Sequence, residues 1–254
     1  MAGKAAASPP TDNRGATLAA NQKHRRHVLR LAGIFLLAIL LSGWGPHYRH
    51  DWLLENALVM AAIPVLYAIY RKLPFSRMSW TLVCIFLCLH ELGAHYTYAR
   101  VPYDAFFQNA FGISLNEALG WERNNFDRVI HFMYGFLLAY PIREIFLSLA
   151  NARGFWGYFL PLDLTLSTSA LFELIEWAAA EVFGGDLGAA YLGTQGDPWD
   201  AHKDMALAAL GALIAMAATA IINLRYHRDF AREWAESLRV KRKGVRRYGL
   251  RVRS

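Results

Sequence analysis

The chain has 254 residues, of which 55% are hydrophobic and only 19% are charged, and its apolar residues fall into long runs. This composition excludes an ordinary soluble domain and is typical of a polytopic membrane protein. The net charge of +7 comes mostly from the C-terminal tail. Because no stretch resembles a nucleic-acid-binding module, we expect no nucleic acid partner.

Residues 1–27 are polar and basic, and we expect them to be disordered and cytoplasmic. Six apolar runs then follow that are long enough to cross a bilayer, which takes ~20 residues; they are 28–44, 52–70, 79–96, 128–147, 156–181 and 204–224. The sequence therefore predicts an all-α fold, a polytopic membrane helix bundle of about six transmembrane helices over residues 28–224. A basic cytoplasmic tail completes the chain at residues 225–254.

The distribution of Lys and Arg predicts the orientation. With a cytoplasmic N-terminus, 22 of the 27 basic residues lie in inner segments, as the positive-inside rule requires. We therefore expect a multi-pass protein of the bacterial inner membrane with both termini in the cytoplasm. Membrane lipids are the expected partners, and anionic headgroups would attract the basic tail by ~1 kcal/mol per charge.

Acidic residues gather on the opposite side: 14 of the 20 fall in outer segments or outer helix halves. Asp and Glu contribute little to orientation, so these acids need another explanation. The ionisable residues in this outer layer are His90, Glu91, Asp127, His131, Glu173, Glu176, Asp200 and Asp204.

The spacing of these residues favours a shared site. Asp127 and His131 are four apart and Glu173 and Glu176 are three apart, so each pair lies on one helical face. Helix bundles bind metals with carboxylates and imidazoles that project inward from facing helices. The candidate catalytic residues are Asp127, His131, Glu173, Glu176 and Asp204, and these five with Asp200 are the candidate ligands of a divalent metal ion. The alternative, in which single residues form packing ion pairs or extend to the interface, stays open.

The stretch RNNFDRVIH opens the fourth span and supplies candidate substrate-binding groups. Arginine can hold a phosphate or a carboxylate with two parallel hydrogen bonds. The candidate substrate-binding residues are Arg123, Arg128, Asn124, Asn125, His90 and Glu91. The sequence contains neither H-E-x-x-H nor G-x-S-x-G, so a zincin or a serine-hydrolase site is not indicated.

The last span carries Gly211 together with Ala208, Ala212 and Ala215 on one face. Small residues in this pattern allow two helix backbones to approach closely in a membrane. We therefore expect this face to pack against another helix.

Three stretches, RNNFDRVIHFMYGF, SALFELIEW and LGTQGDPWDAHKDMALAALGA, resemble the YjdF-like bacterial inner-membrane family DUF2238. The likeness extends over most of residues 50–224. It implies a polytopic inner-membrane protein and does not by itself imply an activity.

More distantly, the motif order resembles VanZ-like membrane proteins, which carry D-K-x-x-H, then a Glu followed three residues later by Gln, then an Asp that opens a last helix with N-x-x-G. The matching residues here are Asp127, His131, Glu173, Asp204 and Gly211. The residues that depart from the pattern are Arg128, Glu176 and Ala208. This resemblance implies a VanZ-like core and a role in the cell envelope.

Two functions remain open at this point. In the first, the protein is an enzyme that acts on a lipid or lipid-linked substrate at the outer leaflet. A divalent ion would polarise an ester or phosphoester and activate water, and a further carboxylate or His131 would act as general base. In the alternative, the same site binds or transports an envelope component without catalysis.

Overall fold

The computed structural model describes residues 13–183, 194–226, 233–234 and 237–238, and every regular element within these ranges is an α-helix. The six long helices are α1 (Asn13–Ser42), α2 (Arg49–Lys72), α3 (Arg77–His95), α6 (Phe126–Ala150), α7 (Trp156–Phe183) and α9 (Asp200–Tyr226). Two short helices, α4 (Tyr103–Phe111) and α5 (Leu115–Leu119), connect α3 to α6. The predicted all-α bundle is confirmed.

Five of the long helices, α2, α3, α6, α7 and α9, are long and apolar enough to cross a membrane. The shortest, α3, has 19 residues, which correspond to ~28 Å of helix, close to the ~30 Å of the bilayer core. Large apolar side chains are exposed along these helices, among them Leu53, Ile63, Leu171, Leu213 and Ile221. An apolar surface of this extent is suited to lipid and not to water.

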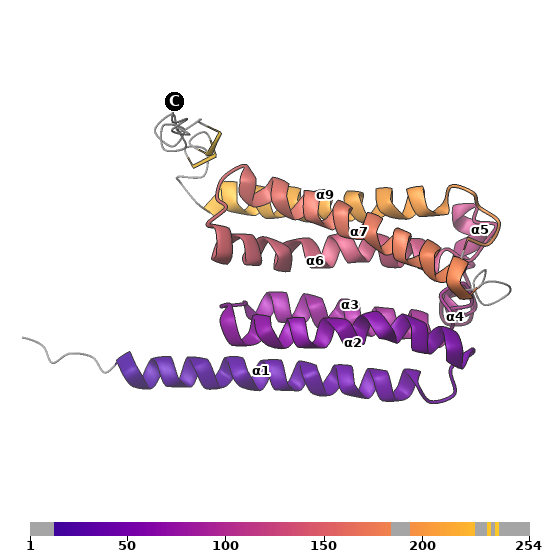
Figure 1. Cartoon of the computed structure of the whole chain (residues 1–254), viewed down its shortest axis with the longest axis horizontal. Helices are drawn as coiled ribbons and strands as arrows, with labels where there is room; N and C mark the ends of the chain where they lie inside the picture. The colour runs from indigo at the N-terminus through magenta and orange to yellow at the C-terminus, as the bar shows by residue number, and fades with distance from the viewer. Residues whose placement is uncertain (1–12, 184–193, 227–232, 235–236, 239–254) are drawn as a thin grey trace, which may run out of the picture.

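The first predicted span lies within α1, which differs from the other five. Its last 18 residues contain Arg25, Arg26 and Arg30, so the longest stretch without charge is residues 31–42. The helix also begins at Asn13, so residues 13–27, which we expected to be disordered, are helical. Since α1 runs beside the other long helices and packs against α3 (Figure 1), it forms the sixth member of the bundle.

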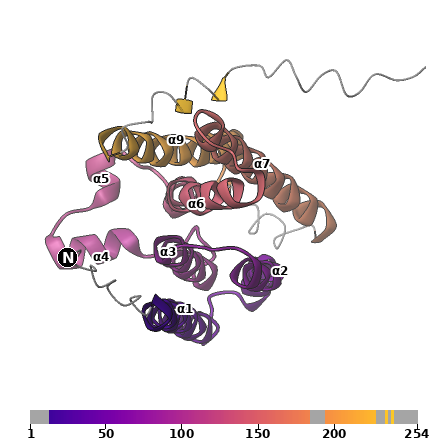
Figure 2. The ribbon, with the colours of Figure 1, turned by 90° about the vertical axis from the view of Figure 1, so that its left-hand side faces the viewer.

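The six long helices form two layers, α1 to α3 in one and α6, α7 and α9 in the other (Figures 1 and 2). Helix α6 is central, because it packs against α7 and α9 in its own layer and against α3 in the other. Helices α4 and α5 lie at one end of the bundle, where α2, α6 and α9 begin and α3 and α7 end (Figure 1). We call this the α4–α5 end.

The closest packing joins α6 to α9 through the small residues predicted for this purpose. Ala208 and Ala212 are completely buried, and Gly211 lies against the backbone of α6. The expected small-residue packing face on the last helix is thus confirmed. It brings the first turns of α6 and α9 together at the α4–α5 end, where the polar residues lie.

Candidate functional site

The start of α6 is fixed by side chains that the sequence indicated as substrate-binding. The backbone N–H of Phe126 donates to Asn124 Oδ1 at 3.0 Å, and the backbone N–H of Asn125 donates to Tyr103 Oη at 3.0 Å. Asn124 Nδ2 also donates to the carbonyl of Val101 at 2.9 Å. Asn124 through its side chain and Asn125 through its backbone N–H therefore hold the first turn of α6 against Val101 and the first residue of α4.

Asp127 and His131 follow on this first turn and meet Asp204 of α9. One potential ligand atom from each of these three residues lies within 4.8 Å of the other two. Helix α9 begins at Asp200, one turn before its predicted start, so Asp204 is already inside the helix. His131 is 8% exposed and Asp204 is 2% exposed. The three residues thus form a compact group, in which His131 and Asp204 are buried and Asp127 is half-buried, and we call it the acid–histidine cluster.

Glu173 of α7 adjoins the acid–histidine cluster. His131 Nε2 lies 3.6 Å from Asp127 Oδ1 and 3.7 Å from Glu173 Oε1. Both Glu173 Oε1 and Asp204 Oδ1 are buried, and neither has a hydrogen-bond partner among the described residues. A buried oxygen without a hydrogen-bond partner costs about 1–3 kcal/mol of stability, and a bound ligand would remove this cost at both atoms. Carboxylate and imidazole groups in this arrangement fit a divalent metal ion.

The two arginines of RNNFDRVIH bind acidic residues before and within the first turn of α9. Arg123 Nη1 lies 2.7 Å from Asp200 Oδ1, and Arg128 Nη2 lies 3.3 Å from the same oxygen. Arg128 also pairs with Asp197, which accepts a bond of 2.5 Å from Lys203. We call these five residues the arginine clamp. Asp200, a predicted metal ligand, is therefore already shared between two guanidinium groups.

Asp197 lies in the loop before α9, outside the membrane-spanning helices. The hydrogen bond from Lys203, followed by those from the Trp199 amide and from Arg128, lowers the pKa of its carboxyl to about 2. It therefore remains ionised at any physiological pH.

Two further candidates, His90 and Glu91, are adjacent on α3 and point in different directions. His90 Nδ1 lies 2.5 Å from Tyr98 Oη and faces α6 and α7. Glu91 accepts a hydrogen bond from Ser42 at the end of α1. Only His90 therefore reaches the same space as the acid–histidine cluster.

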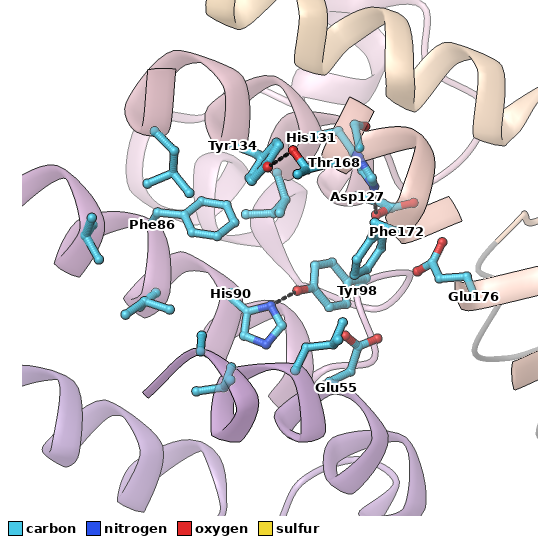
Figure 3. A pocket seen from close by; sticks show the side chains of 18 of the residues that line it. Glu55, Phe86, His90, Tyr98, Asp127, His131, Tyr134, Thr168, Phe172 and Glu176 are labelled. Carbon is cyan, nitrogen blue, oxygen red and sulfur yellow. Dashed lines mark hydrogen bonds and ion pairs between the residues drawn. The ribbon is translucent and has the colours of Figure 1, made fainter. Parts of the chain in front are cut away.

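That space is a cavity of about 340 Å³ between α2, α3, α6 and α7. Figure 3 shows Glu55, His90 and Tyr98 on one side of it, Asp127 and His131 on the other, and Glu176 reaching in from α7. The acid–histidine cluster thus opens through Asp127 and His131 onto a cavity, which we call the central pocket.

Sequence reasoning missed Asp51, Glu55 and Tyr98, which all line the central pocket. Glu55 had a recognisable signal, because an ionisable residue inside an apolar span is expensive and is usually functional, whereas Asp51 directly precedes the predicted span 52–70. Tyr98 had none. Burial, followed by the carboxylates of Glu55 and Asp127, raises the pKa of its phenol well above the usual range, so the phenol stays protonated.

Comparison with known proteins supports the membrane assignment. No solved structure matches the chain. Inner membrane protein YjdF of Escherichia coli (strain K12) is 35% identical over 202 residues, which cover 79% of this chain and 90% of that protein. These matches do not test the resemblance to VanZ-like proteins, which stays a prediction. The family model described as predicted membrane protein (DUF2238) matches residues 27–225, and the chain therefore belongs to this family of multi-pass inner-membrane proteins.

Proposed function

We propose that the protein is a metal-dependent membrane enzyme that hydrolyses or transfers an ester or phosphoester group of a lipid or lipid-linked substrate. The observation that carries this proposal is the meeting of Asp127, His131 and Asp204 within 4.8 Å, next to the central pocket. Two carboxylates and an imidazole balance the charge of a divalent ion and leave coordination positions open for water and substrate.

The roles of the individual residues follow from their contacts. Asp127, His131 and Asp204 would hold the ion, which would polarise the substrate and lower the pKa of a bound water. Glu173 lies 3.7 Å from His131 and has a free buried oxygen, so it suits the role of general base or of a fourth ligand. The arginine clamp would hold the first turns of α6 and α9 in register.

The proposal places the site at the outer leaflet, with both termini in the cytoplasm. This orientation rests on the excess of Lys and Arg in the predicted inner segments, two of which, the α2–α3 and α6–α7 connections, lie at the opposite end of the bundle from α4 and α5 (Figure 1). A pocket between helices at that depth would receive a lipid from the membrane and water from outside.

Elemental analysis of the detergent-purified protein tests the metal directly. The variant to compare is Asp127→Asn with Asp204→Asn, and the matched control is Asp163→Asn, because Asp163 is exposed on α7. We expect a near-stoichiometric divalent metal in the wild-type protein and the control, and its loss from the double variant. Wild-type protein that remains free of metal after purification in added zinc, manganese or magnesium would contradict the proposal.

Turnover is tested on the same samples. The purified proteins are incubated with mixed micelles of inner-membrane phospholipids, and the products are identified by mass spectrometry. We expect products with the wild type and the control and none with the double variant. A protein that retains stoichiometric metal and releases no product would favour the alternative, a binding or transport protein that uses the same site.

A further inference from the structure

The central pocket has an apolar part and a polar part. Its apolar part lies between α2, α3 and α6 and is lined by Leu58, Ala62, Leu66, Phe86, Leu87 and Leu138. Its polar part lies toward the α4–α5 end, next to the acid–histidine cluster. A cavity built in this way matches an amphiphile, with its hydrocarbon chain along the helices and its headgroup at the α4–α5 end.

The ionisable side chains of the polar part are mostly acidic. Four acids line the pocket, namely Asp51, Glu55, Asp127 and Glu176, whereas the described lining residues include neither Lys nor Arg. Figure 3 shows Glu55 and Glu176 entering this space from α2 and α7. A ligand that enters the pocket therefore meets carboxyl groups and two imidazoles but no Lys or Arg side chain among the described lining residues.

Two of these polar side chains are deeply buried and lack a protein partner for one atom. Glu55 is 5% exposed and His90 is 8% exposed. Glu55 Oε2 and His90 Nε2 are buried and without a hydrogen-bond partner among the described residues, as is Asp51 Oδ2. Burying such groups is unfavourable unless something pairs with them. The ligand that normally occupies the pocket is the natural candidate.

The nearby arginines already have partners. Arg128 binds Asp197 and Asp200 in the arginine clamp. Arg100 Nη1 lies 2.6 Å from His47 Nε2, and its guanidinium lies 5.2 Å from the centre of the Tyr48 ring. These arginines therefore do not neutralise Glu55 and Glu176, and a cationic ligand would do so.

We propose that the central pocket binds a lipid whose headgroup carries a protonated primary amine. The ammonium group lies between Glu55 and Glu176 and donates to the free oxygen of Glu55, while the hydrocarbon chain lies along Leu58 and Ala62. This inference rests on the proposed function only in calling that lipid the substrate of the acid–histidine cluster. Binding itself requires neither the metal nor turnover.

The chemistry discriminates between headgroups. An ammonium group offers three N–H donors to carboxylates, and a hydrogen bond to a charged group contributes about 1.5–3 kcal/mol. A neutral alcohol lacks the charge, and an anionic sulfate placed between Glu55 and Glu176 would meet their carboxyl groups with no Lys or Arg in the lining to receive it. Amine recognition should therefore appear as a preference between ligands with the same hydrocarbon chain.

The experiment uses the full-length protein in dodecyl maltoside and measures dissociation constants by tryptophan fluorescence for four probes: hexadecylamine, hexadecanol, hexadecyl sulfate and butylamine. We expect hexadecylamine to bind at least about tenfold more tightly than hexadecanol. Equal affinities for these two probes would overturn the assignment of the headgroup. Equal affinities for hexadecylamine and butylamine would show a site for small amines and overturn the lipid assignment.

Variants locate the binding. Glu55→Gln keeps the size of the side chain and removes its charge, so it should reduce the preference for the amine to about twofold. Glu181→Gln, at an exposed position of α7, is the matched control and should keep the wild-type preference. Ala62→Phe should fill the apolar part of the central pocket and therefore weaken the binding of hexadecylamine and of hexadecanol to the same extent. An unchanged preference in Glu55→Gln would overturn the proposal.

Metal content, measured on the same samples, separates the two proposals. Glu55→Gln should retain the metal of the wild type, because Glu55 does not belong to the acid–histidine cluster. Wild-type protein that prefers the amine but holds no metal would overturn the proposed function and support this inference. Wild-type protein that holds the metal but shows no preference for the amine would support the proposed function and overturn this inference.

Discussion

Gly135 of α6 and Ala208 of α9 are in such close contact that a Cβ atom on Gly135 would lie 1.8 Å from the carbonyl oxygen of Ala208. Both helices start at the α4–α5 end, and His131 and Asp204 each lie four residues before this contact. The contact therefore sets the distance between the two halves of the acid–histidine cluster, one helical turn away.

Gly135→Ala should force the two helices apart. The obstacle is backbone, which a side-chain rotation cannot remove, so we expect a loss of about 1–3 kcal/mol in stability and a lower metal content. Thermal unfolding in detergent, followed by circular dichroism, gives the first quantity, and elemental analysis gives the second. Gly33→Ala is the control, because a Cβ there meets nothing within 4 Å. Equal melting temperatures for the two variants would contradict this account of the α6–α9 contact.

Asp200→Asn should weaken the arginine clamp from the α9 side. The change leaves Arg123, whose side chain is 13% exposed, without its carboxylate partner, and breaking a buried ion pair costs on the order of 3 kcal/mol. The matched control is Glu233→Gln, which breaks the exposed pair that Glu233 forms with Arg153 at 3.9 Å. That pair should contribute no more than about 1 kcal/mol. Similar losses in the two variants, measured by thermal unfolding, would argue against the clamp.

Asp197 should make the clamp sensitive to acid. Its pKa in the folded protein is about 2, whereas an unperturbed Asp titrates near ~3.9, so the unfolded state binds more protons between these values. The stabilisation by Asp197 is complete above about pH 4 and is lost as the pH falls toward 2. Melting temperatures from pH 5 to pH 2 should fall less steeply in Asp197→Asn than in the wild type or in Asp163→Asn. Parallel curves for all three proteins would contradict the prediction.

The helices and the pairs that share a helical face could be predicted from the sequence, because both depend on local periodicity. Asp127 and His131 are on one turn of α6 as their spacing indicated. The partners of Arg123 and Arg128 could not be predicted, since Asp197 and Asp200 lie about 70 positions further along the chain. Many acids were available to an arginine, and only the tertiary fold selects one.

Two other features had weak or misleading local signals. Helices α4 and α5 are short and lie in a stretch of mixed polarity, where neither a long apolar run nor a clear period marks them. The N-terminal part of α1 is polar and basic, which is a composition typical of disorder, yet its residues from Asn13 continue the helix. Composition alone does not distinguish a polar extension of a helix from a disordered tail.

Gly93 and Tyr98 should behave as a coupled pair. A Cβ on Gly93 would lie 2.5 Å from Cε1 of Tyr98, so Gly93→Ala should displace the ring and break its contact with His90. Tyr98→Phe removes the same hydrogen bond, at a cost of about 1 kcal/mol. In a double-mutant cycle, Tyr98→Phe should therefore cost little once Gly93→Ala is present. Additive losses in thermal unfolding would show that the ring keeps its position.

The orientation of the bundle can be tested by labelling cysteines in a Cys84→Ser, Cys88→Ser background. Glu122→Cys, between α5 and α6, should react with a membrane-impermeant maleimide in spheroplasts, because the proposed topology places this exposed residue outside the cell. Arg153→Cys, between α6 and α7, should react only after the membrane is permeabilised. The reverse pattern would invert the topology and move the acid–histidine cluster to the inner leaflet.

The same experiment decides whether α1 crosses the membrane, where Arg25, Arg26 and Arg30 limit its longest uncharged stretch to residues 31–42. Lys23→Cys, exposed in the first half of α1, should be labelled only after permeabilisation if α1 is the sixth span. Labelling in intact spheroplasts would place this part of the chain outside and leave five spans. We expect six, because a crossing α1 puts its arginines on the same side as the basic tail, as the positive-inside rule favours.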